Sequence, residues 1–330
     1  MSAIMITGGA GYIGSHVAWA CVDEGRPVVV LDSLANGRRE NIPPQAVFVQ
    51  ADIADYAAVV DALRANDVTS VMHFAGSIIV PESVEKPLEY YENNTGKTVQ
   101  LLQACRDAGV ARFVFSSTAA VYGPTLADCI GEDADKAPAS PYGASKLMTE
   151  TILRDMSAAT GLDYAVLRYF NVAGADPLGR TGQSMRNATH LIKVASQAAL
   201  GDRPVLDIFG DDYPTADGTC VRDYIHVSDL ADAHLRALDH LAGHGGCLTL
   251  NCGYGRGASV KEIVRAFGDY LGRDLPVRIA PRRAGDPPRL VADTTQITQK
   301  LPAWTPRLKA YSDIIGTAFE WEKKLRASVD

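Results

Sequence analysis

The stretch that most constrains the fold is an apolar run that breaks into a glycine-rich turn near the start of the chain. Residues 3–7 read AIMIT, and glycines follow at Gly8, Gly11 and Gly14 before an apolar helical pattern resumes. Gly8 is expected to take a tight turn at positive φ, which is favourable only without a Cβ. Gly11 would let the backbone approach a pyrophosphate, and Gly14 would let the helix pack close to the sheet. The unpaired N–H groups that begin this helix would then bind phosphate oxygens.

A carboxylate follows the second apolar run at the position that a dinucleotide site requires. Asp32 directly follows the apolar run at 27–31. Its distance from the glycine turn is close to the offset of about 20 residues expected for an acid that binds an adenosine ribose. The alternative is that Asp32 only caps a strand before the turn at 33–37. The order strand, glycines, helix, strand and acid favours the dinucleotide. Because a carboxylate repels a 2′-phosphate, we expect NAD rather than NADP, although Arg38 and Arg39 follow.

Composition excludes several other classes of protein. The 330 residues suffice for one large or two modest domains, and 47% of them are hydrophobic. A net charge of −7 argues against a general nucleic-acid or anionic-membrane binder, and no apolar run approaches the ~20 residues of a membrane span. Residue 2 leads straight into the first strand, so no signal peptide is expected. Six cysteines without a CxxC pair indicate reduced thiols in a cytoplasmic protein, with no metal site.

Up to about residue 170, runs of strand length alternate with helical spacing. We expect strands at 47–49, 70–74, 112–115 and 165–168, and helices at 56–65, 93–108 and 141–159. This alternation predicts an α/β fold with a doubly wound parallel sheet of the Rossmann type. Ligands bind outside the carboxyl ends of such strands. The polar segments that follow the strands therefore indicate one common site.

Beyond residue 171 the alternation loosens. Helices are expected at 191–200, 228–241, 260–271 and 306–325, and strands at 204–210 and 248–251. We therefore expect a dinucleotide-binding domain at 1–171, with some later segments returning to it. Residues 172–330 would mainly form a smaller, mixed α/β substrate domain.

A tyrosine and a lysine stand four residues apart near the start of an expected helix. This spacing places Tyr142 and Lys146 on one face. The ammonium would favour the phenolate of a tyrosine whose usual pKa is about 10. The hydroxyl of Thr118, at the preceding strand end, could bind the same reacting oxygen. A surface tyrosine beside a solvated lysine is the alternative, but the position between two strand ends favours catalysis.

These motifs together resemble a known family. The glycine turn, Asp52-Ile53, a Ser/Thr before 121–123 and the Tyr142–Lys146 spacing are similar to those of the extended short-chain dehydrogenases/reductases. The segments that narrow the resemblance to UDP-glucose (UDP-galactose) 4-epimerases are 11–16, 89–94, 169–171, 212–219, 221–227 and 282–286. It covers nearly the whole chain. It implies a cytoplasmic homodimer that reversibly inverts C4 of a UDP-hexose through a transient 4-keto sugar, with NAD bound throughout.

The resemblance also assigns roles to individual residues. It implies catalytic roles for Tyr142, Lys146 and Thr118. It implies NAD contacts at Gly8, Gly11, Tyr12, Ile13, Gly14, Asp32, Asn36, Asp52, Ile53, Phe74, Ala75, Gly76, Asn94, Tyr142, Lys146 and Tyr169. It implies substrate contacts at Thr118, Tyr142, Asn171, His190, Leu191, Phe209, Arg222, Tyr224, Arg283, Asp286 and Leu290. Arginine forks suit diphosphate oxygens, which agrees with two of these assignments.

Some residues depart from the family pattern and leave the preferred sugar open. Ile78 stands where a lysine is common in the family, and the loss of that lysine would weaken NAD retention. His190 and Lys193 also replace residues that are common in the family. Leu290 is either a gate beside the C2 substituent of the sugar or a core residue of a strand at 290–292. The alternatives are a UDP-pentose or UDP-N-acetylhexosamine 4-epimerase, a sugar dehydratase and a non-catalytic NAD sensor. A dehydratase is disfavoured because Ala119-Ala120 occupies the place of its acid pair.

Overall fold

The computed structural model describes residues 2–123, 127–185, 189–283 and 286–327. Its strands are β1 Ala3–Thr7, β2 Val28–Leu31, β3 Val47–Val49, β4 Val68–His73, β5 Arg112–Thr118, β6 Asp163–Tyr169, β7 Asn171–Ala173, β8 Leu206–Phe209, β9 Val221–His226, β10 Cys247–Cys252, β11 Gly257–Ser259, β12 Val277–Ala280 and β13 Arg289–Leu290. Its α-helices are α1 Tyr12–Asp23, α2 Tyr56–Ala65, α3 Val80–Glu85, α4 Pro87–Tyr91, α5 Lys97–Asp107, α6 Pro141–Thr160, α7 Leu191–Leu200, α8 Val227–His244, α9 Val260–Leu271, α10 Thr295–Lys300 and α11 Tyr311–Ala327. Short helical turns are η1 Arg39–Asn41, η2 Glu92–Gly96 and η3 Ala119–Val121.

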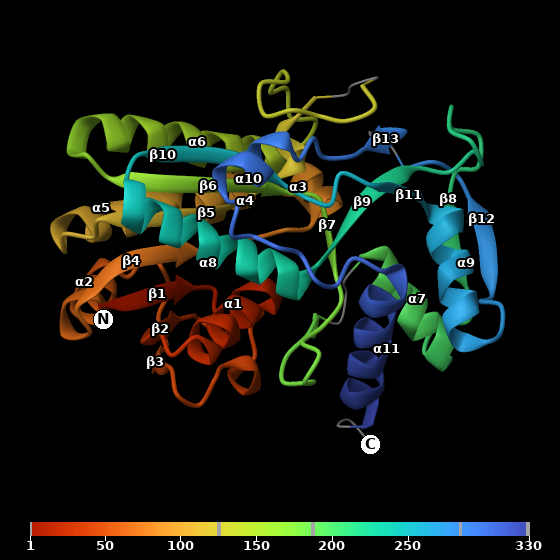
Figure 1. Ribbon diagram of the computed structural model, residues 1–330, viewed down its shortest axis with the longest axis horizontal. Coiled ribbons are helices and arrows are strands. Elements are labelled where there is room, and N and C mark those ends of the chain that lie inside the picture. Colours follow the sequence, from red (N-terminus) through yellow and green to blue (C-terminus); the bar gives the residue numbers. More distant parts are fainter. Residues whose placement is uncertain (1, 124–126, 186–188, 284–285, 328–330) are drawn as a thin grey trace.

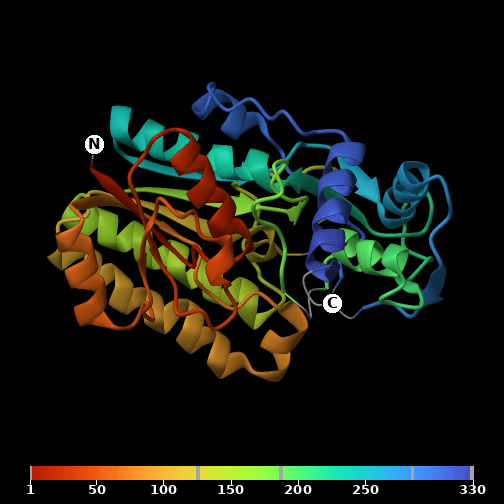
Figure 2. The same ribbon diagram turned by 90° about the horizontal axis from the view of Figure 1, so that it is seen from below.

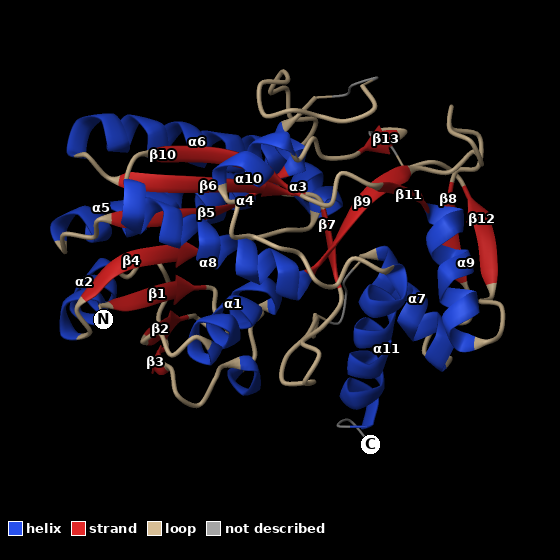
Figure 3. Cartoon of the chain, viewed as in Figure 1, coloured by secondary structure: helices blue, strands red, loops and turns tan. Residues whose placement is uncertain are grey.

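A seven-stranded parallel sheet forms the larger part of the molecule (Figures 1 and 3). Its order is β10-β6-β5-β4-β1-β2-β3, and every neighbouring pair is parallel. The order reverses between β1 and β4, which is where doubly wound sheets bind their ligands. The expected α/β Rossmann architecture is thereby confirmed.

Helices cover both faces of this sheet because its strands are apolar on both sides (Figure 2). Successive side chains of a strand point to opposite faces. In β1, Ile4 and Ile6 join a core with α1, α8 and α10. Ala3 and Met5 join a second core with α2, α5 and α6. An uninterrupted apolar run such as AIMIT therefore belongs to a strand between two helix layers.

Two elements from the second half of the chain complete the large sheet. Strand β10 pairs in parallel with β6 over its whole length, from Cys247 opposite Tyr164 to Cys252 opposite Tyr169. Helix α8 contacts α1, and its residues Leu230 and Leu235 belong to the same core as Ile4. The chain therefore leaves the large sheet after β6 and later returns to it.

The remaining elements form a smaller region beyond the carboxyl ends of the parallel strands (Figures 1 and 2). Strand β9 pairs with β7, β11 and β13, and β8 pairs with β12. A separate core lies among α7, α9 and α11, with Ile192, Phe267 and Ile314 fully or nearly fully buried. Helix α9 begins with a capping box between Ser259 and Glu262, which satisfies two backbone N–H groups. This region faces the end of the sheet where a ligand is expected.

Several expected elements differ from the structure at their ends, such as the strand expected at 204–210, which is β8 at 206–209. The expected helix at 93–108 begins with a π turn, η2, before α5 starts at Lys97. The expected strand at 290–292 is limited to Arg289–Leu290, and the last helix begins at Tyr311 instead of residue 306. A π turn is a single-turn irregularity within otherwise continuous helical backbone, so a pattern read as one helix over 93–108 did not reveal it.

None of the helices in the described ranges has the length and apolar character that a bilayer crossing needs. Within the same ranges, no group of three or more His, Cys, Asp or Glu side chains is arranged to hold a metal ion.

Candidate active site

A cavity of about 970 Å³ opens at the carboxyl edge of the large sheet. It runs from the glycine turn after β1 to the segment after β6 and on to residues 183–185 and 190. The predicted site residues that line it are Gly8, Gly11, Tyr12, Ile13, Gly14, Asp32, Asn36, Asp52, Ile53, Phe74, Ala75, Gly76, Thr118, Tyr142, Lys146, Tyr169, Asn171 and His190. One continuous space thus joins the expected cofactor residues to the expected catalytic residues.

The glycine turn has the close contacts that its pattern predicts. Gly8 has a φ of +69°, and a Cβ there would lie 2.6 Å from the nitrogen of Ala75. A Cβ on Gly14 would lie 2.4 Å from the oxygen of Gly8, so α1 packs against the turn itself. Gly11 directly precedes α1 and lines the cavity. A cradle of bare backbone at a helix N-terminus suits the pyrophosphate of a dinucleotide.

Asp32 lies at the end of β2 with its carboxylate already engaged. Its Oδ2 accepts a hydrogen bond from the Ala10 nitrogen at 2.9 Å, and its Oδ1 accepts one from the Leu34 nitrogen at 2.8 Å. The capping interpretation is therefore correct as far as it goes. A carboxylate has about four acceptor sites, so this one can also receive a ribose hydroxyl from the cavity.

Asp52 is paired with a lysine that sequence reasoning missed. The Nζ of Lys97 lies 2.6 Å from Oδ2 of Asp52, and both residues line the cavity. Burial raises the pKa of Asp52, but the Lys97 ammonium and the Ala54 N–H outweigh it and hold that pKa below its usual value. The two residues come from different parts of the chain, so no local motif could reveal the pair.

Asn94, which the resemblance assigns to a cofactor contact, lies behind the wall of the cavity. Its side chain is 2% exposed and does not line the cavity. Its Oδ1 accepts from the Ser77 nitrogen at 2.7 Å, and its Nδ2 donates to the Ser145 hydroxyl at 3.1 Å. Asn94 therefore ties the segment after β4 to α6, behind the wall formed by Gly76 and Ser77.

Tyr142, Lys146 and Thr118 come together at one wall of the cavity. Thr118 ends β5, and Tyr142 and Lys146 lie one turn apart in α6. Lys146 Nζ donates to the Ser116 carbonyl at 3.0 Å. Burial lowers the pKa of Lys146 to about 8, with Glu150 acting in the opposite direction.

The pKa of Tyr142 moves opposite to the direction expected from sequence. Burial raises the pKa of Tyr142 above its usual value, and the hydrogen bond from Thr118 only partly lowers it. The expectation that Lys146 would lower that pKa considered charge alone. Desolvation of the buried phenolate has a larger effect on the pKa than the nearby charge.

A buried ion pair supports this wall from behind. Arg168 on β6 places Nη2 2.6 Å from Oε2 of Glu150, and both side chains are less than a tenth exposed. Oε1 of Glu150 also accepts from the Ser117 hydroxyl at 2.5 Å. On the same side, the Tyr169 phenol hydrogen-bonds the Ser116 hydroxyl. The end of β5 is therefore fixed by contacts to α6 and β6.

The other predicted substrate residues lie in the smaller region and do not line the large cavity. They are Leu191, Phe209, Arg222, Tyr224, Arg283, Asp286 and Leu290. Arg222 and Asp286 pair with each other, with Nη2 2.6 Å from Oδ1. The Arg283 guanidinium lies 3.9 Å from the centroid of the Phe209 ring. Ala284 and Gly285, which belong to the same sequence motif, are outside the described residues.

Three of these predicted substrate residues pack against other side chains of the smaller region or its border instead of lining the large cavity: Tyr224, Leu191 and Leu290. Tyr224 is 3% exposed, and burial raises its pKa. Leu191 begins α7 and packs partly buried against the core of the smaller region. Leu290 packs partly buried against a cluster that contains Tyr122, Ile130 and Phe170. Phe170 of that cluster lines the large cavity, and Leu290 does not.

Comparison with known proteins adds independent information. Residues 4–253 match the NAD dependent epimerase/dehydratase family. The UDP-glucose 4-epimerase of Azospirillum brasilense is 57% identical over 326 residues, covering 99% of this chain and 93% of that protein. The solved UDP-glucose-4-epimerase of Stenotrophomonas maltophila, with bound NAD and formylated UDP-arabinopyranose, is 38% identical with a TM-score of 0.96, covering 99% of this chain and 100% of that one. The Bifidobacterium longum UDP-glucose 4-epimerase, in complex with NAD+ and UDP, is 34% identical with a TM-score of 0.92, covering 98% of each chain.

Proposed function

This chain belongs to the NAD dependent epimerase/dehydratase family, and on that premise we propose that its large cavity holds NAD and the sugar of a UDP-hexose side by side. The chain is an NAD-dependent epimerase that interconverts UDP-glucose and UDP-galactose at C4 through a transient 4-keto sugar. The observation that carries the proposed site is the continuity of the cavity from the glycine turn to Tyr142 and Thr118.

We propose that Tyr142 is the general acid and base. Its phenolate oxygen takes the proton of the 4-hydroxyl group and later returns it, while the Thr118 hydroxyl binds the same sugar oxygen. NAD, when bound, supplies the reversible oxidation and reduction at C4. Lys146 contributes a positive charge one helical turn from the phenol, which favours the phenolate against the opposing effect of burial.

We propose that residues 1–171, completed by α8 and β10, bind NAD. The bare backbone at Gly8 and Gly11 would hold the pyrophosphate, and Asp32 would accept from the adenosine ribose. The rest of the chain would hold the UDP-sugar. The guanidinium groups of Arg222 and Arg283 would bind the diphosphate oxygens. Arg222 also pairs with Asp286, so its guanidinium would contact both the diphosphate and this carboxylate.

We also propose a cytoplasmic homodimer. All six cysteines are free thiols, which agrees with a reducing compartment. Val84, Leu88 and Met148 are 62%, 81% and 46% exposed and come from α3, α4 and α6, three helices that contact one another. An exposed apolar surface on adjoining helices suits a contact with a second copy.

A turnover assay without added cofactor tests the function directly. The purified protein should convert UDP-galactose to UDP-glucose with no NAD in the buffer, and it should release NAD when denatured, because each reaction cycle restores the cofactor. If activity instead needs stoichiometric NAD and accumulates NADH, the protein is a dehydrogenase and the proposal is wrong.

A further inference from the structure

A loop from the smaller region forms part of the large cavity, and two helices fix it from outside. The 174–185 loop begins where the Tyr12 hydroxyl donates to the Gly174 carbonyl at 2.7 Å. Near its other end, a Cβ on Gly182 would lie 2.4 Å from Cγ of Trp321, so the loop lies directly on the indole of α11. Residues 183–185, the last of this range, line the large cavity.

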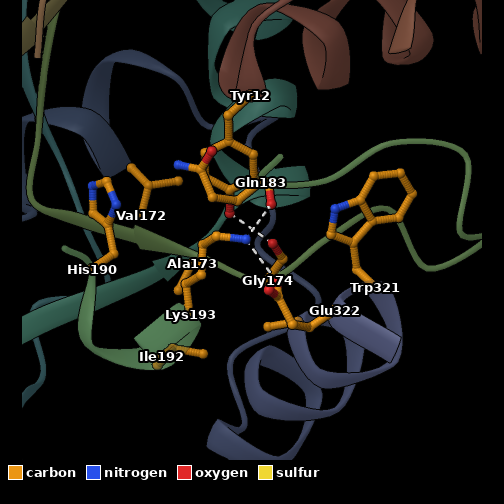
Figure 4. Close-up of a pocket in the computed structure, with 11 residues that line it drawn as sticks. Tyr12, Val172, Ala173, Gly174, Gln183, His190, Ile192, Lys193, Trp321 and Glu322 are labelled. Atoms are coloured by element: carbon orange, nitrogen blue, oxygen red, sulfur yellow. Dashed lines mark hydrogen bonds and ion pairs between the residues drawn. The ribbon is translucent and has the colours of Figure 1, made fainter. Parts of the chain in front are cut away.

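A buried ion pair holds the last part of this loop (Figure 4). Lys193 of α7 places its Nζ 2.7 Å from Oε2 of Glu322 in α11, and both side chains are a tenth exposed or less. The same Nζ donates to the Gln183 carbonyl at 2.9 Å. Desolvation offsets much of the attraction in a buried pair, so such a pair contributes little net stability. The second contact of the Lys193 ammonium, to the Gln183 carbonyl in the loop, indicates a role in positioning.

Gln183 is the residue that this arrangement fixes. Its Oε1 accepts from the Met185 nitrogen at 3.1 Å, and its carbonyl accepts from Lys193. Its Nε2 is buried and finds no hydrogen-bond partner among the described residues. Gln183 and His190 line both the large cavity and a small adjoining one that Lys193 and Glu322 also border (Figure 4). A buried donor without a partner is costly, unless a ligand supplies the acceptor.

We propose that Gln183 is a substrate-contact residue whose Nε2 donates to a hydroxyl of the bound sugar, and that Lys193 and Glu322 form a positioning pair for it. This inference rests on the proposed function, because it places the sugar in the large cavity. It assigns a recognition role to a residue that no sequence motif contains. It also explains why a lysine, an expensive residue to bury, stands at position 193.

The test is a mutant cycle read by steady-state kinetics of the holoenzyme with UDP-galactose. The variants are Gln183→Leu, the double variant Lys193→Met/Glu322→Met, which removes both charges together, and the triple combination. Gln183→Leu and the double variant should each raise KM about 2- to 30-fold, which is the range of energetic coupling measured through packed contacts. The kcat of each variant should change by less than about twofold. The triple variant should have no higher KM than the worse of the two, since the pair acts through Gln183.

The control is Lys323→Met, which removes an ion pair with Glu320 on the exposed side of the same helix and should leave KM and kcat unchanged. Retained NAD shows that each variant is folded. If the double variant does not fold, Gln183→Leu decides the assignment alone. Unchanged KM in Gln183→Leu, or KM effects that multiply in the triple variant, would overturn the proposal. Lack of interconversion by the parent enzyme would instead refute the proposed function.

Discussion

The Thr118 hydroxyl lies close enough to the Tyr142 phenol to oppose the rise in its pKa that burial causes, so the end of β5 and the first turn of α6 present two oxygens to the same cavity wall. Two hydroxyl groups in contact can bind one sugar oxygen from two sides. Of the two, only a phenol can act as an acid or base, because its usual pKa of about 10 lies far below that of an aliphatic hydroxyl, and a nearby positive charge favours the phenolate against the effect of burial. The pair therefore divides into an acid–base group and a hydrogen-bonding partner.

Replacing Tyr142 by Phe should remove the acid–base step while the cavity keeps its shape. We expect the variant to retain NAD and to lose about 10²- to 10⁴-fold in kcat, the usual contribution of a general acid or base. UDP-galactose turnover and NAD content are the measurements. Tyr164→Phe is the control, since Tyr164 is a buried tyrosine of β6 outside the cavity, and its turnover should stay normal. A kcat near that of the parent in Tyr142→Phe would contradict the assignment.

The size limit of the sugar site is expected to involve Leu290. Leu290 packs against a cluster that includes Phe170, a residue of the cavity lining, so we expect a larger side chain at position 290 to narrow the cavity indirectly. We expect UDP-glucose and UDP-galactose as main substrates and weak turnover of UDP-N-acetylglucosamine. Leu290→Tyr should reduce the turnover of UDP-N-acetylglucosamine by about tenfold or more, which is the scale on which apolar pockets discriminate. The turnover of UDP-glucose and UDP-galactose should stay unchanged. A variant that treats both sugars as the parent does would make Leu290 a core residue only.

Buried histidines should make the protein sensitive to mild acid. Burial lowers the pKa of His73 to about 3, with Lys146 adding to the effect, and burial lowers the pKa of His234 to about 4. In the unfolded chain these groups take up protons near pH 6.5. Their stabilising effect is thus complete above that pH and is lost as the pH falls toward 3 to 4, at up to about 1.4 kcal/mol per pH unit for each group.

The measurement is the free energy of unfolding between pH 7.5 and pH 4.5. His73→Asn should flatten its slope below pH 6.5 by close to one proton relative to the parent. The exposed His244 is the control position, and His244→Asn should keep the slope of the parent. Identical slopes for His73→Asn and the parent would show that His73 is not kept neutral by burial.

The proposed homodimer can be tested on its apolar surface. Leu88→Lys and Met148→Lys place charges on α4 and α6 at side chains that are largely exposed in the single chain. If a second copy covers this surface, the charges should convert the dimer to a monomer in analytical ultracentrifugation. Leu178→Lys, at an exposed leucine of the 174–185 loop, is the control and should leave the assembly unchanged. A parent protein that sediments as a monomer would disprove the dimer.

Local signals were sufficient to predict most of the large sheet and the glycine turn that lines its cavity. The helices at 56–65, 191–200 and 260–271 agree with α2, α7 and α9 to the residue. Their ends carry strong local signals, such as the Ser259 cap and the glycines at positive φ after α7 and α9. The glycine turn was equally clear, because its steric requirements act within a few residues of each other.

Contacts between distant segments could not be predicted in this way. The pairs Lys97–Asp52, Arg168–Glu150 and Lys193–Glu322 each join different elements, and no spacing rule connects their members. The predicted direction of the Tyr142 pKa shift was wrong for a related reason, because burial depends on all the elements packed around the phenol. Residues 183–185 carried no motif, although they line the cavity.

The return of β10 to the edge of β6 has a consequence for how the protein must be made. Six strands of the large sheet have left the ribosome once Tyr169 has emerged, but the seventh is synthesised only after the smaller region has been started. Until Cys252 emerges, β6 presents an unpaired edge and α1 lacks the helix that covers it. The nascent chain cannot finish one region before beginning the other. We expect that proteolysis between them will not release a stable NAD-binding fragment.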